Sequence, residues 1–125
     1  CILAGGSSRR FGVNKAFAKL HGKPLLQHVI ERIRAQTSGP LIMNANDLQQ
    51  YEQFALKIIA DDKWPGAGPL AGVYAAISWA RDIGLDLVVT VAVDQPLLPP
   101  NYLATLLQTG APAIAASFGR RHPVN

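Results

Sequence analysis

Cysteine, charge and aromatic side chains are all scarce in this 125-residue chain. Cys1 is its one cysteine, which excludes an internal disulfide and fits a reducing compartment, so we expect a cytoplasmic protein. Charged residues make up 16% of the chain, and no apolar run is long enough to cross a membrane. No motif typical of RNA or DNA binding is present. We therefore expect neither a nucleic acid nor a membrane among its partners.

The net charge is +4, but most basic residues are scattered along the chain. They gather near the start, around Arg10 and Lys15, and near the end, at Arg120 and Arg121. Both groups lie beside predicted loops, which favours a small anionic ligand over a nucleic-acid surface. Arg120, Arg121 and His122 would suit an anionic acceptor, and a solvated loop explains them almost as well.

Size and composition predict one folded domain over residues 1–125. Apolar residues make up 49% of the chain, which is enough to form a core. The chain begins inside a predicted strand and ends where another strand is starting. We therefore expect this domain to be truncated at both ends.

Hydrophobic periodicity predicts strands that alternate with helices. The predicted strands cover residues 1–3, 41–43, 57–60, 87–93 and 113–116, and the helices cover 24–36, 47–54, 70–81 and 99–108. The run 87–93 is rich in β-branched residues, as expected for a central parallel strand that is buried on both faces. The fold class is α/β, with a doubly wound, mostly parallel, Rossmann-like sheet flanked by helices on both faces.

Polar residues follow each predicted strand. A glycine-rich loop follows the first strand, and the later strands are followed by Asn44–Asn46, Asp61–Asp62, Asp94 and Arg120–Arg121. In folds of this class, ligands bind outside the carboxyl ends of the strands. The pattern therefore predicts one ligand site built from all these segments.

The glycine-rich loop, residues 3–15, has the composition of a phosphate-binding loop. Glycines allow a close approach of the backbone, and Arg10 and Lys15 add positive charge. Lys15 is followed by Ala16, which excludes a Walker loop, and the glycine spacing excludes a dinucleotide fingerprint. The pattern L-A-G-G-x-S-x-R-F-G-x-x-K resembles the signature loop of sugar-nucleotide-type nucleotidyltransferases, in particular the molybdenum cofactor guanylyltransferases.

Several residues fit the chemistry of nucleotidyl transfer. Asp94 ends an apolar strand, where a carboxylate suits a Mg²⁺ ion that faces phosphates; the alternative is a helix cap or a turn. Lys15 and Arg10 would neutralise the β- and γ-phosphates and the leaving pyrophosphate. Asn44 and Asp61 would recognise the base or ribose, and turn or cap residues are the alternative for both.

The resemblance to molybdenum cofactor guanylyltransferases extends over nearly the whole chain. Further matching segments are G-K-P-L at 22–25, N-A-N at 44–46, G-P-L-A-G at 68–72, D-x-P at 94–96 and R-x-H-P at 120–123. The resemblance implies catalytic roles for Arg10, Lys15 and Asp94, with Asp94 as the magnesium ligand. It implies a GTP site formed by Leu3, Ala4, Gly5, Gly6, Ser7, Lys15, Asn44, Asp61, Pro69, Leu70, Gly72 and Asp94.

The activity implied by the resemblance is the transfer of GMP from GTP to the phosphate of molybdenum-bound molybdopterin. The products would be pyrophosphate and the guanine dinucleotide cofactor. Transient contact with other molybdenum cofactor proteins is also implied. The family's later asparagine-containing segment, near its second metal contact, is absent from the sequence. Either a second metal ligand lies beyond Asn125, or this fragment is inactive. Three alternatives stay open: transfer from CTP to molybdopterin, transfer from a nucleotide to a sugar phosphate, and a non-catalytic nucleotide-binding module.

Overall fold

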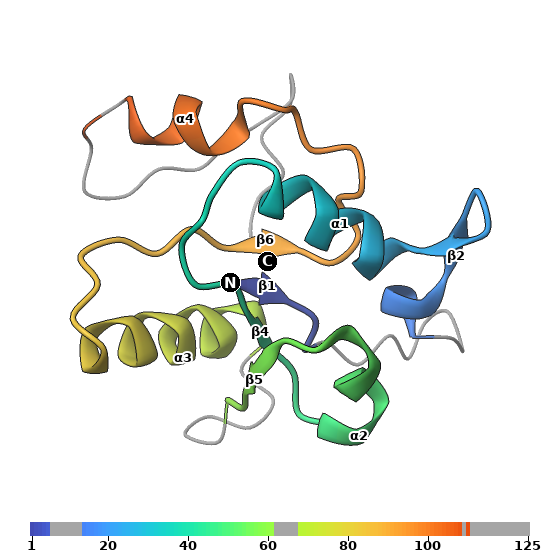
Figure 1. The fold of residues 1–125 in the computed structure, drawn as a ribbon. Coiled ribbons are helices and arrows are strands. Elements are labelled where there is room, and N and C mark those ends of the chain that lie inside the picture. Colours follow the sequence, from blue (N-terminus) through green and yellow to red (C-terminus); the bar gives the residue numbers. More distant parts are fainter. Residues whose placement is uncertain (6–13, 62–67, 109, 111–125) are drawn as a thin grey trace.

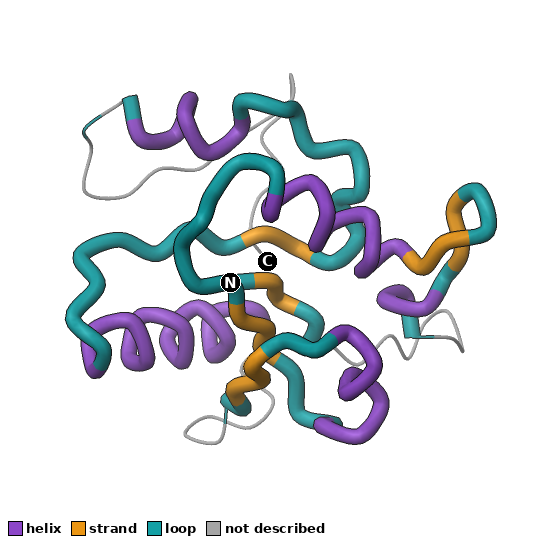
Figure 2. Tube along the Cα trace, in the orientation of Figure 1, coloured by secondary structure: helices purple, strands orange, loops and turns teal. Residues whose placement is uncertain are grey.

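A computed structural model describes residues 1–5, 14–61, 68–108 and 110. Four parallel strands form the main sheet (Figures 1 and 2). They are β1 (Ile2–Leu3), β4 (Ile42–Asn44), β5 (Lys57–Ile59) and β6 (Val91–Ala92). The order across the sheet is β5-β4-β1-β6, with Ile2 beside Met43 on one side and Val91 on the other. The chain therefore moves outward from β1 to β5 and returns to the opposite side of β1, which confirms the doubly wound prediction.

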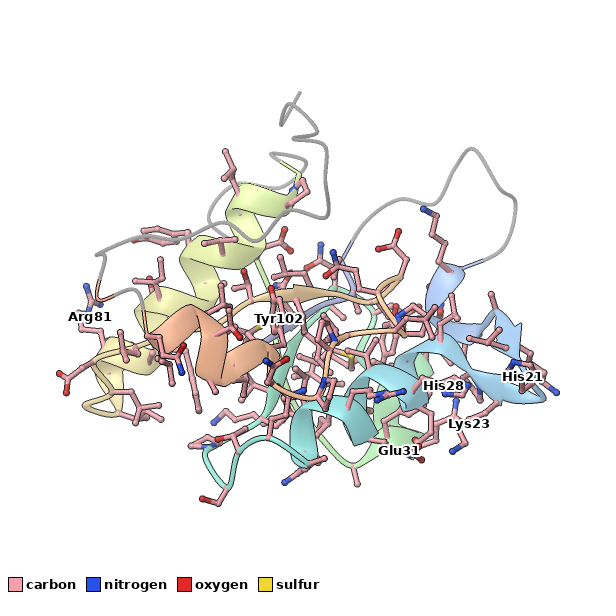
Figure 3. The ribbon with its side chains drawn as sticks, turned by 90° about the horizontal axis from the view of Figure 1, so that it is seen from above. His21, Lys23, His28, Glu31, Arg81 and Tyr102 are labelled. Carbon is pink, nitrogen blue, oxygen red and sulfur yellow. The ribbon has the colours of Figure 1, made fainter. Side chains whose placement is uncertain are left out.

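Helices cover both faces of this sheet. They are α1 (Leu25–Arg34), α2 (Leu48–Tyr51), α3 (Pro69–Asp82) and α4 (Tyr102–Leu107), with short 3-10 helices η1 (Lys15–Phe17) and η2 (Glu52–Phe54). The two views place α1 and α2 on one face and α3 on the other (Figures 1 and 3). This change of face follows from right-handed crossovers once the direction of strand addition reverses.

Helix α1 supplies most of the core on its side of the sheet. Leu26, Val29, Ile30 and Ile33 recur at helical spacing and are buried, and they pack in one cluster with Ile2 and Met43. Pro24 precedes the helix, where the missing N–H costs nothing. The predicted helix 24–36 is thus confirmed, with shorter ends.

Helix α3 meets the other face through small side chains. Its buried residues are Ala71, Gly72, Ala76 and Ala80. Gly68, at φ +70, precedes the helix, and Gly84, at φ +76, follows it, so each has a backbone conformation that L side chains rarely adopt. Helix 70–81 and its glycine stop were both predicted.

The predicted strand 87–93 is wrong in length, while its central position stays a prediction. Only Val91–Ala92 forms a strand, and among the described residues it pairs with β1 alone. Leu87 is 68% exposed. The Val89 carbonyl accepts a hydrogen bond from the Cys1 amino group, and the Val93 amide donates to the Leu3 carbonyl, so residues 89–93 lie beside the start of the chain although only two of them form a strand. The predicted strand 113–116 lies outside the described residues.

A small hairpin between the first loop and α1 was not predicted. It pairs β2 (Lys19–Leu20) with β3 (Lys23–Pro24) in antiparallel fashion. His21 and Gly22 form the turn, both with positive φ, as a type I′ turn requires. Lys23 binds Glu31 of α1 through bonds of 3.0 and 2.8 Å, and Figure 3 shows these two side chains beside each other. His28 donates from Nε2 to the Leu20 carbonyl at 2.8 Å, so α1 holds the hairpin at two points.

Candidate nucleotide-binding site

An ion pair marks the point where the chain direction across the sheet reverses. Lys15 Nζ lies 3.1 Å from Asp94 Oδ2, between the segment that follows β1 and the end of β6. Ligands of doubly wound sheets bind at this switch point. The two side chains are 43% and 44% exposed, so both charges can reach a ligand in solvent. The structure thus brings together two of the three predicted catalytic residues.

Lys15 is placed by the 3-10 helix that it begins. Asn14 caps this helix, and its Oδ1 accepts a hydrogen bond from the Ala16 amide at 3.1 Å. Ala16 is fully buried and fixes the helix on the core. The ring of Phe17 stacks on that of Tyr51, with centroids 5.4 Å apart. The backbone beneath Lys15 is therefore anchored by both its neighbours.

Asp94 is placed by the end of β6. The Val93 amide donates to the Leu3 carbonyl at 3.2 Å, which keeps the chain beside β1 for one residue beyond the strand. The Gln95 amide then bonds to the Ala92 carbonyl at 3.2 Å and closes a turn around Val93 and Asp94. This turn presents the carboxylate at the exposed edge. The alternative prediction of a turn aspartate is therefore confirmed, and the role of Asp94 as a magnesium ligand stays a prediction.

The position of Asp94 is compatible with a Mg²⁺ ion whose other ligands are substrate phosphates and waters. In the described segments, no group of three or more His, Cys, Asp or Glu side chains could hold a metal by itself. Mg²⁺ is commonly bound by one or two carboxylates together with substrate phosphates and waters. A half-exposed carboxylate beside a lysine fits that arrangement, and Asp94 would hold the ion once phosphate oxygens complete the shell.

Asn44 lies beneath the site and links three elements. It ends β4, is 1% exposed, and donates from Nδ2 to the Ile59 carbonyl of β5 at 3.1 Å. Its own carbonyl accepts from the Ala4 amide at 2.9 Å. A Cβ on Gly72 would overlap the Asn44 side chain, and one on Gly5 would lie 3.0 Å from its Oδ1. Close packing thus requires glycine at position 72, a side chain at position 5 would press on the same amide, and the role of Asn44 in reading a base stays a prediction.

Asp61 follows β5 and carries an unusual oxygen. Its Oδ1 is buried, and the described residues provide no hydrogen-bond partner for it. The Asp61 amide donates to Asn46 Oδ1 at 3.3 Å, which ties it to the segment after β4. A buried carboxylate oxygen without a partner is costly, and a ligand with N–H groups would satisfy it. This geometry suits the predicted contact with a base or ribose.

A polar cavity of about 210 Å³ opens at the same edge of the sheet. Its lining comes from the ends of β1 and β4 and from α2 and its cap: Ala4, Gly5, Asn14, Ala45, Asn46, Asp47, Gln50 and Tyr51. A larger apolar hollow of about 260 Å³ lies at the opposite edge, among Cys1, Leu41 and Val89. The polar cavity is the one that adjoins Lys15, because Asn14 precedes it in the chain.

The remaining predicted residues fall into two groups. Leu3, Ala4 and Gly5 lie at the carboxyl end of β1, while Pro69 and Leu70 begin α3 and Leu70 is 67% exposed. The other group lies outside the described residues and consists of Gly6, Ser7, Arg10, Arg120, Arg121 and His122. Asn14 and Tyr51 were not predicted, although Asn14 stands directly before the lysine of the signature loop.

None of the helices in the described ranges has the length and apolarity needed to cross a bilayer.

Known proteins resemble the chain over nearly its whole length. A molybdenum cofactor guanylyltransferase from Acidiphilium cryptum is 39% identical over 122 residues, which cover 97% of this chain and 61% of the relative. The chain spans about three fifths of the length of the curated relatives that it matches.

Two solved structures share the fold. Molybdopterin-guanine dinucleotide biosynthesis protein A from Archaeoglobus fulgidus has a TM-score of 0.64 and 29% identity, over 87% of this chain and 53% of that protein. CMP:2-keto-3-deoxy-manno-octonic acid synthetase complexed with CTP has a TM-score of 0.66 and 25% identity, over 86% of this chain and 44% of the synthetase. Residues 1–124 match the family described as the MobA-like NTP transferase domain, and the chain belongs to that family.

Proposed function

We propose that this protein transfers GMP from GTP to the phosphate of molybdenum-bound molybdopterin. The observation that carries the proposal is the Lys15–Asp94 pair at the switch point between β1 and β6. It supplies a cation for phosphates and a carboxylate for a metal, both of which nucleotidyl transfer requires. The choice of GTP and of the pterin acceptor is supported by the 39% identical relative, whose name states that activity.

The reaction needs charge stabilisation rather than a nucleophilic side chain. An oxygen of the acceptor phosphate would attack the α-phosphorus of GTP, and the bond from that phosphorus to the pyrophosphate oxygen would break. The pyrophosphate leaves with the electron pair of that bond. Lys15 would neutralise the charge that grows on the leaving group, and such preorganised contacts are a large source of rate enhancement.

Magnesium is part of this proposal. The chemistry that a bound Mg²⁺ ion would supply is positive charge that offsets the negative charge of the phosphate oxygens. Asp94 would hold the ion at the sheet edge, and Lys15 would exchange its bond with Asp94 for one with a phosphate. Asp61 would accept hydrogen bonds from the nucleotide through its unsatisfied Oδ1. Arg10 and the group Arg120, Arg121 and His122 stay predicted contacts for phosphate and acceptor.

The test is a comparison of four nucleotides. Purified protein receives GTP, CTP, ATP or UTP with Mg²⁺ and molybdenum-loaded molybdopterin, and pyrophosphate release is measured. We expect release with GTP. Release with CTP alone would favour cytidylyl transfer, a reading that the likeness to a structure complexed with CTP keeps open. Binding of GTP without any pyrophosphate release would favour a non-catalytic module.

The reaction is expected in the cytoplasm, since one cysteine in 125 residues fits a reducing compartment. Transient contacts with other molybdenum cofactor proteins, which would use the product, stay a prediction.

A further inference from the structure

One buried hydroxyl touches both described ends of the signature loop. Tyr51 of α2 is 3% exposed. Its Oη accepts a hydrogen bond from Asn14 Nδ2 at 2.9 Å and donates one to the Ala4 carbonyl at 3.4 Å. Ala4 directly follows β1, and Asn14 directly precedes Lys15. The residue that follows β1 and the residue that caps η1 are therefore joined through a single side chain.

Asn14 is held by more than this bond. Its Oδ1 accepts from the Ala16 amide at 3.1 Å, and its Nδ2 also donates to Gln50 Oε1 at 3.2 Å. A primary amide has two N–H donors, so Tyr51 and Gln50 use both of them. The side chain has one orientation that satisfies all three partners. Because Asn14 caps η1, that orientation also sets the backbone from which Lys15 extends.

The ring of Tyr51 is fixed independently of its hydroxyl. Phe17, two residues after Lys15, stacks on it with a centroid distance of 5.4 Å, and Phe54 packs against Phe17 at 6.0 Å. Asp47 caps α2 by accepting from the Gln50 amide at 3.5 Å. The packing of Tyr51 against Phe17 thus holds its hydroxyl within hydrogen-bonding distance of Asn14.

We propose that Tyr51 and Asn14 are positioning residues that hold Lys15 opposite Asp94 before nucleotide arrives. This inference rests on the proposed function. A site that is already arranged binds its ligand more tightly, because the apparent affinity scales with the fraction of molecules in the competent state. Loss of the tether lowers this fraction, and bound nucleotide restores it through its own contacts. The effect therefore falls on nucleotide affinity more than on the chemical step.

The experiment compares three variants with wild type. Tyr51→Phe keeps the ring and removes only the hydroxyl. Asn14→Ser keeps a side-chain oxygen that can cap η1 but is too short to reach Tyr51. Their combination tests whether one tether is involved. Tyr102→Phe is the control, because it removes a hydroxyl from a partly buried tyrosine on another helix, α4.

Each single variant is expected to raise KM for GTP about threefold to tenfold, the range of one or two ordinary hydrogen bonds. The kcat and the KM for the pterin acceptor stay within about twofold of wild type, and the double variant is less impaired than additivity would give. A fall in kcat with unchanged KM, a changed preference between GTP and CTP, or full additivity would overturn the inference.

Amide hydrogen exchange, measured without nucleotide, tests the role of Tyr51 and Asn14 independently of whether the protein transfers GMP. The Ala16, Phe17 and Ala18 amides bond to Asn14 and Lys15. Without any nucleotide, they are expected to exchange about threefold to tenfold faster in Tyr51→Phe, while the amides of α1 are unchanged. If wild type shows no transfer with GTP but this exchange pattern is found, the proposed function fails and the tether stands. Unchanged exchange in both single variants overturns the tether.

Discussion

Lys15 and Asp94 are 79 positions apart in the chain, yet their side chains form a 3.1 Å ion pair across the two strands at the switch point. Each is about half exposed, so water screens their attraction, and such pairs contribute only about 0–1 kcal/mol to folding. The pair therefore contributes little to the stability of the fold, and its two charges remain accessible to a ligand.

Replacing either member of the pair should abolish activity and spare the fold. Lys15→Ala and Asp94→Asn are each expected to lower kcat/KM for GTP by about 100-fold or more, because each removes a charge aimed at the phosphates or their metal. Pyrophosphate release measures this loss. The free energy of unfolding, measured in urea, should change by less than about 1 kcal/mol. Lys19→Ala and Asp82→Asn, both exposed, are the matched controls.

Removal of magnesium should have the same consequence as loss of Asp94. Excess chelator is expected to stop pyrophosphate release, and added Mg²⁺ should restore it. In Asp94→Asn, far more Mg²⁺ should be needed to reach half-maximal rate, because the remaining ligands are phosphates and waters. Equal Mg²⁺ requirements in wild type and Asp94→Asn would show that this carboxylate holds no metal.

The orphaned oxygen of Asp61 predicts a specific effect on nucleotide affinity. Asp61→Asn keeps the size of the side chain but puts an amide where a carboxylate would accept N–H groups. We expect KM for GTP to rise about tenfold or more, as for a lost hydrogen bond to a charged group. Because a neutral amide atom costs less to bury without a partner than a charged carboxylate oxygen does, stability should not fall. Asp86→Asn, an exposed aspartate outside the polar cavity, is the comparison.

Close packing between α3 and β4 predicts that Gly72 cannot carry a side chain. A Cβ there would overlap the buried Asn44 amide and lie 3.1 Å from Leu3 Cδ2. Gly72→Ala is therefore expected to lower the free energy of unfolding by about 1–3 kcal/mol. Gly39→Ala is the control, because its nearest neighbour is the movable Thr37 hydroxyl at 3.2 Å. Equal stability of the two variants in urea would contradict the packing argument.

The Lys23–Glu31 pair predicts a dependence of stability on pH. Hydrogen bonds from Lys23, and secondarily from Gln27, lower the pKa of Glu31 below its usual 4.5. A lowered folded-state pKa means that the stabilisation is present above about pH 4.5 and is lost as the pH falls through the folded value. Glu31→Gln should thus be slightly less stable than wild type at pH 7. The difference should vanish near pH 2, which urea unfolding at both pH values can check.

Local patterns predicted most elements, because each helix or strand expresses its own periodicity. The face of α1, the Asp47 cap and the glycine stop after α3 all follow from neighbouring residues. The bounds of β6 did not, since a strand is defined by its pairing with a second segment and not by its own composition. The sequence of one segment alone does not determine which of its residues pair with a neighbouring strand.

The same distinction applies to the site. Lys15 and Asp94 could be predicted to meet, because strand ends converge in this fold class. That Asn44 would be buried under Gly5 and Gly72 could not, since the distance between α3 and β4 depends on packed side chains from several elements. The bond between Tyr51 and Asn14 joins two loop-and-helix junctions, and no periodicity links them.

The position of β1 between β4 and β6 has a consequence for folding. The pairs β1–β4 and β4–β5 close over shorter stretches of chain than β1–β6, which must bring Val91 back to Ile2. Loop closure costs more entropy as the stretch lengthens, and non-local pairing is slow. A refolding molecule would thus regain helical signal first, and recovery of the proposed nucleotide binding would report that β6 has docked beside β1.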